Sequence, residues 1–150
     1  MLRKISVVLI TILFIPCISN AGTIKVIDQD SHFIAYINGI VKDTKTGLEW
    51  FVGPDRNTTW DEAKSWAESL SIDGGGWRLP TLKELGTLYK EGAETLNMTP
   101  LLKDSSWWIW SVETKDPSSA WLFSFNLGKD YLFERSSSFN FRAFAVRSRQ

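Results

Sequence analysis

His32, the only histidine of the chain, is the side chain best suited to act as a general base near neutral pH. It directly follows Asp30 and Ser31, so the three residue types of a hydrolytic triad stand side by side. Serines are frequent in this sequence, however, and the surrounding segment is rich in turn-forming residues. We therefore expect His32 to be a solvated or sheet-edge histidine, and we predict no catalytic residue.

Metal and thiol chemistry have few candidate residues. One histidine and one cysteine, Cys17, are too few for an ordinary zinc site, and Cys17 lies in a segment that we expect to be removed. Calcium needs only oxygen ligands, and the obvious groupings are Asp28 with Asp30 and Asn126 with Asp130. Neither grouping resembles an EF-hand loop, so we predict no metal and no cofactor.

Two pairs of carboxylates could be proposed for glycoside hydrolysis, which uses two such groups. They are Glu113 with Asp116, and Asp130 with Glu134. Neither pair has the sequence signature of a catalytic site, and exposed charge is the ordinary explanation. A small enzyme or pseudo-enzyme acting on envelope glycans therefore remains the alternative to a binding function.

The aromatic residues are more informative, because the chain has 8 tryptophans and 9 phenylalanines. Most of them should form the core. Trp107 and Trp108 are adjacent, and successive side chains of an extended segment point to opposite faces. We therefore expect at least one of the two to leave the core and to contribute to a ligand-binding surface. A second small aromatic cluster is the alternative.

The first residues of the chain have the pattern of an export signal. Arg3 and Lys4 precede a mostly apolar stretch at residues 5–18, and small residues then favour cleavage after Ala21. The stretch is shorter than the roughly 20 residues that a membrane-spanning helix needs. We therefore predict a signal peptide over residues 1–21 and one exported domain over residues 22–150, located in the periplasm or the extracellular space.

Three further features of the sequence bear on lipid attachment, on the class of partner and on disulfides. Pro16 stands where a lipoprotein has a small residue, so we do not expect lipid attachment at Cys17. Without the leader the domain has two more acidic than basic residues, which argues against nucleic acid or an anionic membrane surface as a partner. Since no cysteine is left for a disulfide, the core must stabilise the fold alone.

Two capping boxes mark the expected helices. The first, Thr59 with Glu62, opens a segment with one apolar face at helical spacing. That face consists of Trp60, Ala63, Trp66, Ala67 and Leu70. The second box, Thr81 with Glu84, opens a helix that we expect to end near Gly92.

The second helix follows a short apolar strand, and together they form a structural motif. The motif comprises Trp77, Arg78, Leu79, Pro80, Thr81 and Glu84. An arginine between apolar neighbours needs a carboxylate or carbonyl partner, so we expect Arg78 to brace the junction with Glu84 or a backbone carbonyl nearby.

Short strands are expected on either side of the helices. The expected strands are Thr23–Ile27, Phe33–Ile37, Leu48–Val52, Ile109–Val112, Trp121–Asn126, Tyr131–Arg135 and Phe141–Arg147. The dipeptide Asn38-Gly39 predicts a type I′ turn. This order of elements predicts an α+β fold with two short helices packed on antiparallel sheet.

Several segments, taken in order, carry a family resemblance. They are Asp43–Trp50, Thr59–Ala63, Trp77–Thr81, Trp110–Ser111, residues 120–128 and Ala145–Ser148. Together they resemble the bacterial DUF1566 family, also called the Lcl C-terminal domain family, from about residue 38 to residue 150. The resemblance implies an exported domain with a C-type lectin-like fold, distantly similar to that of formylglycine-generating enzymes.

The functional implications of this resemblance are limited. Formylglycine-generating enzymes use cysteine chemistry, and the mature chain has no cysteine. The collagen-like adhesin that gives the family its name binds sulfated polysaccharide, but this chain has no collagen-like repeat. We therefore predict a non-enzymatic binding or cell-envelope interaction domain whose partner is a glycan or an envelope protein. A structural accessory subunit is a further alternative.

Overall fold

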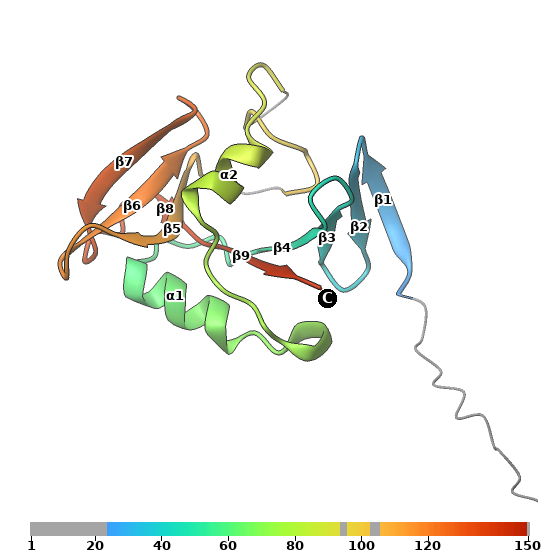
Figure 1. Cartoon of the computed structure of the whole chain (residues 1–150), viewed down its shortest axis with the longest axis horizontal. Helices are drawn as coiled ribbons and strands as arrows, with labels where there is room; N and C mark the ends of the chain where they lie inside the picture. Colours follow the sequence, from blue (N-terminus) through green and yellow to red (C-terminus); the bar gives the residue numbers. More distant parts are fainter. Residues whose placement is uncertain (1–23, 94–95, 103–105, 150) are drawn as a thin grey trace, which may run out of the picture.

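The computed structural model describes residues 24–93, 96–102 and 106–149 (Figure 1). The expected leader, with Cys17 and the cleavage point after Ala21, lies outside the described residues. Within them the chain forms nine strands, two α-helices and one 3₁₀ turn. In chain order these are β1 (Val26–Asp30), β2 (Phe33–Tyr36), β3 (Val41–Asp43), β4 (Leu48–Val52), α1 (Trp60–Ser69), η1 (Ile72–Gly74), α2 (Leu82–Leu88), β5 (Trp108–Thr114), β6 (Ser119–Ser124), β7 (Lys129–Glu134), β8 (Phe141–Arg142) and β9 (Phe144–Ser148).

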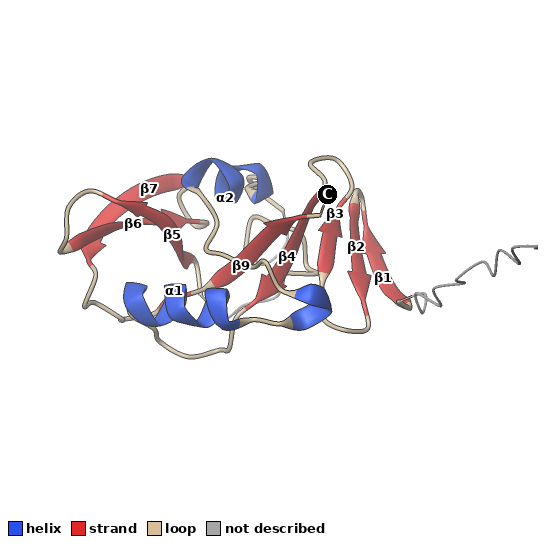
Figure 2. Ribbon diagram, turned by 60° about the horizontal axis from the view of Figure 1, so that its bottom comes forward, coloured by secondary structure: helices blue, strands red, loops and turns tan. Residues whose placement is uncertain are grey.

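The strands form two sheets, which lie side by side in Figure 2. The first sheet has the order β1-β2-β3-β4-β9 and is antiparallel throughout. The second has the order β7-β6-β5-β8 and is antiparallel except for a two-residue parallel pairing of β5 with β8. The predicted α+β class, with two helices packed against antiparallel sheet and no disulfide, is confirmed. No helix in the described part of the chain is long and apolar enough to cross a membrane.

One residue connects the two sheets. The expected single strand over residues 141–147 is wrong, because Ala143 interrupts it and separates β8 in one sheet from β9 in the other. The Gly53 amide donates a hydrogen bond of 3.0 Å to the Ala143 carbonyl. A Cβ atom on Gly53 would overlap with that carbonyl oxygen, so only glycine permits this approach.

Both capping boxes form as predicted. The helix α1 buries Trp60, Ala63 and Ala67 on its predicted face. The helix α2 ends at Leu88 rather than near Gly92, because its C-cap residue Tyr89 is extended, with ψ of 128°.

The core consists of two clusters on opposite faces of the second sheet. The first core cluster contains Ile109 and Phe123, and the second contains Trp110 and Leu122, so neighbouring residues of β5 and β6 alternate between the clusters. Helix α2 packs against β5 and β6, whereas α1 packs against β5 and β9, and the two helices lie on opposite sides of the sheet in Figure 2. Because both faces carry core residues, period-two alternation in this sheet does not separate core from solvent.

The first sheet departs from expectation at two turns. Strand β1 continues to Asp30 instead of ending at Ile27, so the break falls at Ser31 and His32. The Asn38-Gly39 turn is not type I′, because only Gly39 of this pair has a positive φ, at 86°.

Candidate functional site

His32 lies at the tip of the β1–β2 hairpin with 34% of its side chain exposed. Its Nδ1 atom is 3.2 Å from the hydroxyl of Ser31, and its Nε2 atom is 3.5 Å from Oδ1 of Asp43. The residue types of a hydrolytic triad therefore meet here, although the aspartate is Asp43 and not the Asp30 that stands beside them in the sequence.

The surroundings of Asp43 give this contact a structural explanation. Oδ1 of Asp43 accepts hydrogen bonds from the amides of Lys45 and Thr46, at 2.8 and 3.3 Å. Oδ2 accepts a hydrogen bond of 2.7 Å from the Thr46 hydroxyl. Asp43 thus caps the turn between β3 and β4, which is a common role of aspartate, and the contact with His32 does not by itself indicate hydrolysis.

The predicted carboxylate pairs have separate local contacts. The carboxylate of Glu113 accepts hydrogen bonds from the Leu82 amide at the start of α2, at 3.1 and 3.2 Å. Asp116 accepts hydrogen bonds from the amide and hydroxyl of Ser118, which lower the pKa of Asp116. The pKa of Asp130 is raised, first by partial burial and second by the negative charge of Glu113. Glu113 and Asp130 lie on β5 and β7, which are separated by β6 in the second sheet.

The structural motif at the start of α2 has the predicted contact. Arg78 donates two hydrogen bonds to Glu84, of 2.8 and 2.6 Å, and a third of 3.0 Å to the Leu79 carbonyl. Burial raises the pKa of Glu84, but its hydrogen bonds with Arg78 and Thr81 outweigh this effect and leave the pKa below its ordinary value. Residues 77–79 are not a strand, since only Arg78 forms a bridge, with Val146 of β9.

Trp107 and Trp108 point to opposite faces, but neither leaves the core outright. Trp107 packs against the first core cluster and Trp108 against the second, and both are half-buried. Both tryptophans therefore lie at the edge of the core, packed against it and still partly exposed. Whether either contributes to a ligand-binding surface stays a prediction.

Trp108 instead joins an aromatic patch, which we define as Trp108, Tyr131 and Phe133. The ring centroid of Trp108 is 5.1 Å from that of Tyr131 and 5.9 Å from that of Phe133. All three side chains are half-buried and lie on the same face of the second sheet. The sequence analysis missed Tyr131 and Phe133, although their spacing of two in a strand was the signal that could have paired them.

Four other tryptophans are buried, as expected of most aromatic residues: Trp50, Trp60, Trp77 and Trp110. Trp121 is only half-buried and lies on the face of β6 opposite to the aromatic patch.

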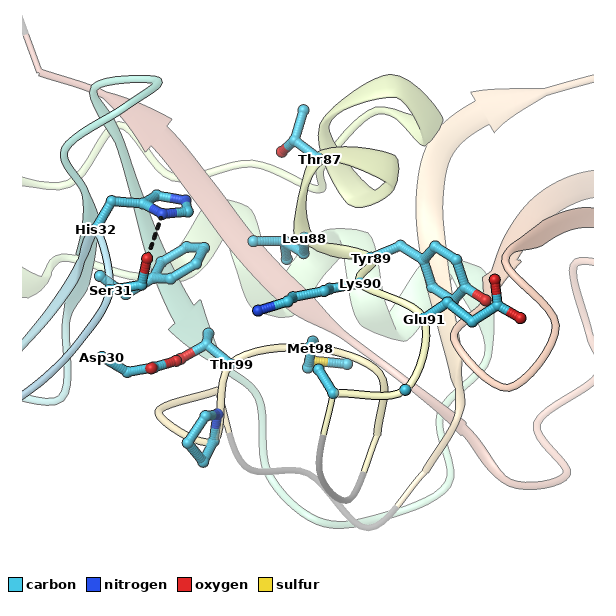
Figure 3. Close-up of a pocket in the computed structure, with 14 residues that line it drawn as sticks. Asp30, Ser31, His32, Thr87, Leu88, Tyr89, Lys90, Glu91, Met98 and Thr99 are labelled. Carbon is cyan, nitrogen blue, oxygen red and sulfur yellow. Dashed lines mark hydrogen bonds between the residues drawn. The ribbon is translucent and has the colours of Figure 1, made fainter.

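A separate pocket lies between the β1–β2 hairpin and the connection from α2 to β5 (Figure 3). Its volume is about 520 Å³, and it is lined by Asp30, His32 and Lys90 among other residues. Sequence reasoning did not find this site, because Asp30 and Lys90 are distant in the chain and no motif links them. Among the residues that the structure describes, no three His, Cys, Asp or Glu side chains are placed to hold a metal ion.

The model of the Lcl C-terminal domain family matches residues 39–147 of this chain. The chain belongs to the Lcl C-terminal domain family. The match includes both helices, the Arg78 motif and the aromatic patch, whereas the β1–β2 hairpin precedes it. A comparison with curated proteins finds no match.

Proposed function

We propose that this Lcl C-terminal family domain is a non-enzymatic binding module and that the aromatic patch contacts a carbohydrate. The observation that carries the proposal is the juxtaposition of Trp108, Tyr131 and Phe133, three half-buried rings on one sheet face. Tryptophan and tyrosine combine a large apolar ring with a polar group, a combination common at binding surfaces. The apolar face of a sugar ring can rest on such a ring.

The patch is also held rigidly. Trp108 contacts Phe141 as well, with ring centroids 6.4 Å apart, and Phe133 contacts Phe141 at 4.9 Å. Because these rings are fixed before binding, little side-chain entropy remains to be lost when a ligand arrives. Lys129 lies in the same cross-strand row as Trp108 and is exposed, so its ammonium group is available to sugar hydroxyls.

We further infer that the domain acts outside the cytoplasm, in the periplasm or the extracellular space, on a glycan or a protein of the cell envelope. The support is the leader pattern at residues 1–21. Cell fractionation followed by sequencing of the mature N-terminus tests this inference, with cleavage after Ala21 as the expected result. A protein that keeps its leader in the cytoplasm would contradict it.

A glycan array probed with residues 22–150, with and without calcium, tests the binding proposal. We expect binding in both conditions. We expect Trp108→Ala and Tyr131→Ala to weaken it at least about ten-fold, the equivalent of 1.4 kcal/mol. Trp107→Ala and Trp121→Ala are matched controls, because both replace half-buried tryptophans on the opposite face.

Thermal melts of every variant separate lost binding from lost folding. Tyr131→Ala is the more informative substitution, since Tyr131 lies on the edge strand β7 and outside both core clusters. Equal glycan binding by the wild type and both patch variants would contradict the role of the patch. If no glycan binds, the result favours a protein partner.

The alternative function, a small enzyme acting on envelope glycans, has one observation in its favour. The pKa of Asp130 is raised by partial burial and by the negative charge of Glu113, which is the direction of shift found in general acids. Incubation with any glycan that binds, followed by mass spectrometry of the products, tests this function. Cleavage that is lost in Asp130→Asn would favour the enzyme, and an intact glycan would favour the binding module.

A further inference from the structure

The pocket beside the β1–β2 hairpin has an apolar floor. Phe33 of β2, Leu88 at the end of α2, and Met98 line it, and all three are buried members of the first core cluster. A floor built from the core is fixed in place. Its volume of about 520 Å³ falls within the range of ordinary small-ligand pockets, which combine apolar linings with a few placed polar groups.

Two opposite charges face each other across this floor. Figure 3 shows the Lys90 ammonium group pointing from the connection after α2 toward the hairpin, and the Asp30 carboxylate pointing from the hairpin toward the connection. Among the described residues, neither Lys90 nor Asp30 forms an ion pair. By contrast, the Glu91 carboxylate lies beside Tyr89, away from the centre of the pocket.

Both walls are anchored by the backbone. The Lys90 amide donates to the Asn97 carbonyl at 2.6 Å, and the Lys90 carbonyl accepts from the Ala93 amide at 3.0 Å. On the other wall, Asp30 pairs with Phe33 in the β1–β2 register. The two charges therefore stand on separate, locally fixed segments, and a ligand bound on the floor would lie between them.

We propose that this pocket binds a short peptide with an apolar side chain and free termini. The side chain rests on Phe33, Leu88 and Met98, the terminal carboxylate faces Lys90, and the terminal ammonium group faces Asp30. A zwitterion complements both walls, whereas a simple anion is repelled by Asp30 and an uncharged sugar leaves both charges unused. His32 stands beside Asp30 on the hairpin wall and offers a further hydrogen-bonding group.

This inference is independent of the carbohydrate proposal, because the pocket and the aromatic patch share no residue. The hairpin wall also precedes the segment that the family model matches. Leu88, Lys90 and Met98, by contrast, lie within the matched segment. Either proposal can fail without the other.

Isothermal titration calorimetry with dileucine, at low ionic strength, tests the site in the domain over residues 22–150. N-acetyl-dileucine lacks the ammonium group, dileucine amide lacks the carboxylate, and free leucine holds its two charges closer together than dileucine does. We expect dileucine to bind at least about five-fold more tightly than each of the three, which corresponds to about 1 kcal/mol per lost charge contact.

The variants assign each charge to one wall. Asp30→Asn should abolish the preference for a free amino terminus, and Lys90→Gln should abolish the preference for a free carboxylate. The matched controls Glu91→Gln and Lys83→Gln remove other exposed charges and should keep both preferences. The Glu91 carboxylate points away from the centre of the pocket in Figure 3, and Lys83 is not among the residues that line it.

Three results would overturn the inference. They are the absence of binding by dileucine, equal affinities for all four probes, and preferences that survive in Asp30→Asn and Lys90→Gln. Thermal melts should show that these variants remain folded, since their side chains lie at the surface or at the pocket rim.

Discussion

Replacement of Arg147 by lysine keeps a positive charge in the core but removes a planar group with several fixed donors. Arg147 and its partner Glu49 have side chains only 6% and 5% exposed, and Nε of Arg147 donates to Glu49 at 2.8 Å. One terminal nitrogen, Nη1, donates to the carbonyls of Ile72, Asp73 and Gly75, at 3.1, 2.9 and 2.8 Å. The guanidinium therefore fastens the turn around η1 to β9.

The magnitude follows from the contacts that lysine cannot reproduce. A lysine ammonium group can still pair with Glu49, but its single nitrogen cannot also take the place of Nη1 beside the three carbonyls. Loss of two hydrogen bonds from a charged donor costs about 3–6 kcal/mol by ordinary values. This is a large share of the roughly 5–15 kcal/mol that stabilises a typical domain.

Urea denaturation followed by tryptophan fluorescence measures the effect, because Trp77 lies under the Arg147 guanidinium, 4.4 Å from its ring centroid. Arg149→Lys is the matched control, since Arg149 also contacts Glu49 and Asp73 but is 54% exposed. We expect the control to lose less than about 1 kcal/mol. A loss below about 1 kcal/mol for Arg147→Lys as well would refute the reasoning.

Three further predictions concern single positions. Gly53→Ala should lose about 1–3 kcal/mol in urea unfolding, because its Cβ would overlap with the Ala143 carbonyl; an unchanged midpoint would mean that the junction yields easily. Ser31→Gly should leave the free energy of unfolding unchanged or raise it by up to about 1 kcal/mol, because Ser31 has φ of 55°. A clear loss of stability would show that the Ser31 hydroxyl stabilises the hairpin. The pKa of Glu84 is lowered in the folded state. The ionised Glu84 therefore stabilises the fold above its unfolded-state pKa of about 4.3, and this stabilisation is lost as the pH falls through its folded-state pKa. The stability difference between the wild type and Glu84→Gln should therefore shrink in acid melts, and a constant difference from neutral to acid pH would contradict this.

The sequence predicted those elements whose signals are local. Each capping box needs only two residues three positions apart, and both formed at Thr59 and Thr81. Strand β4 (Leu48–Val52) has the predicted bounds, because turn residues flank a short apolar run. Glu84 was found as the partner of Arg78 for the same reason, since the two are close in the chain.

The remaining features depend on contacts between distant segments. Nothing in the run from Phe141 to Arg147 shows that the strand changes sheets at Ala143, because the reason is a close approach by Gly53. The half-burial of Trp108 depends on Tyr131 from another strand. The pocket beside the β1–β2 hairpin likewise forms only because the hairpin and the connection after α2 lie next to each other. Hydrophobic periodicity carries no information about contacts between such distant segments.

The crossing at Ala143 has a consequence for the rate of folding. The last strand, β9, pairs with β4 in a register that joins Ser148 to Leu48, while β8 pairs with β5 in the other sheet. Residues 141–148 thus supply the last strand of each sheet. Such distant pairings give a high contact order, for which the entropy of loop closure must be lost before the contacts form. We expect slow, cooperative folding in which neither sheet is complete until residues 141–148 have docked.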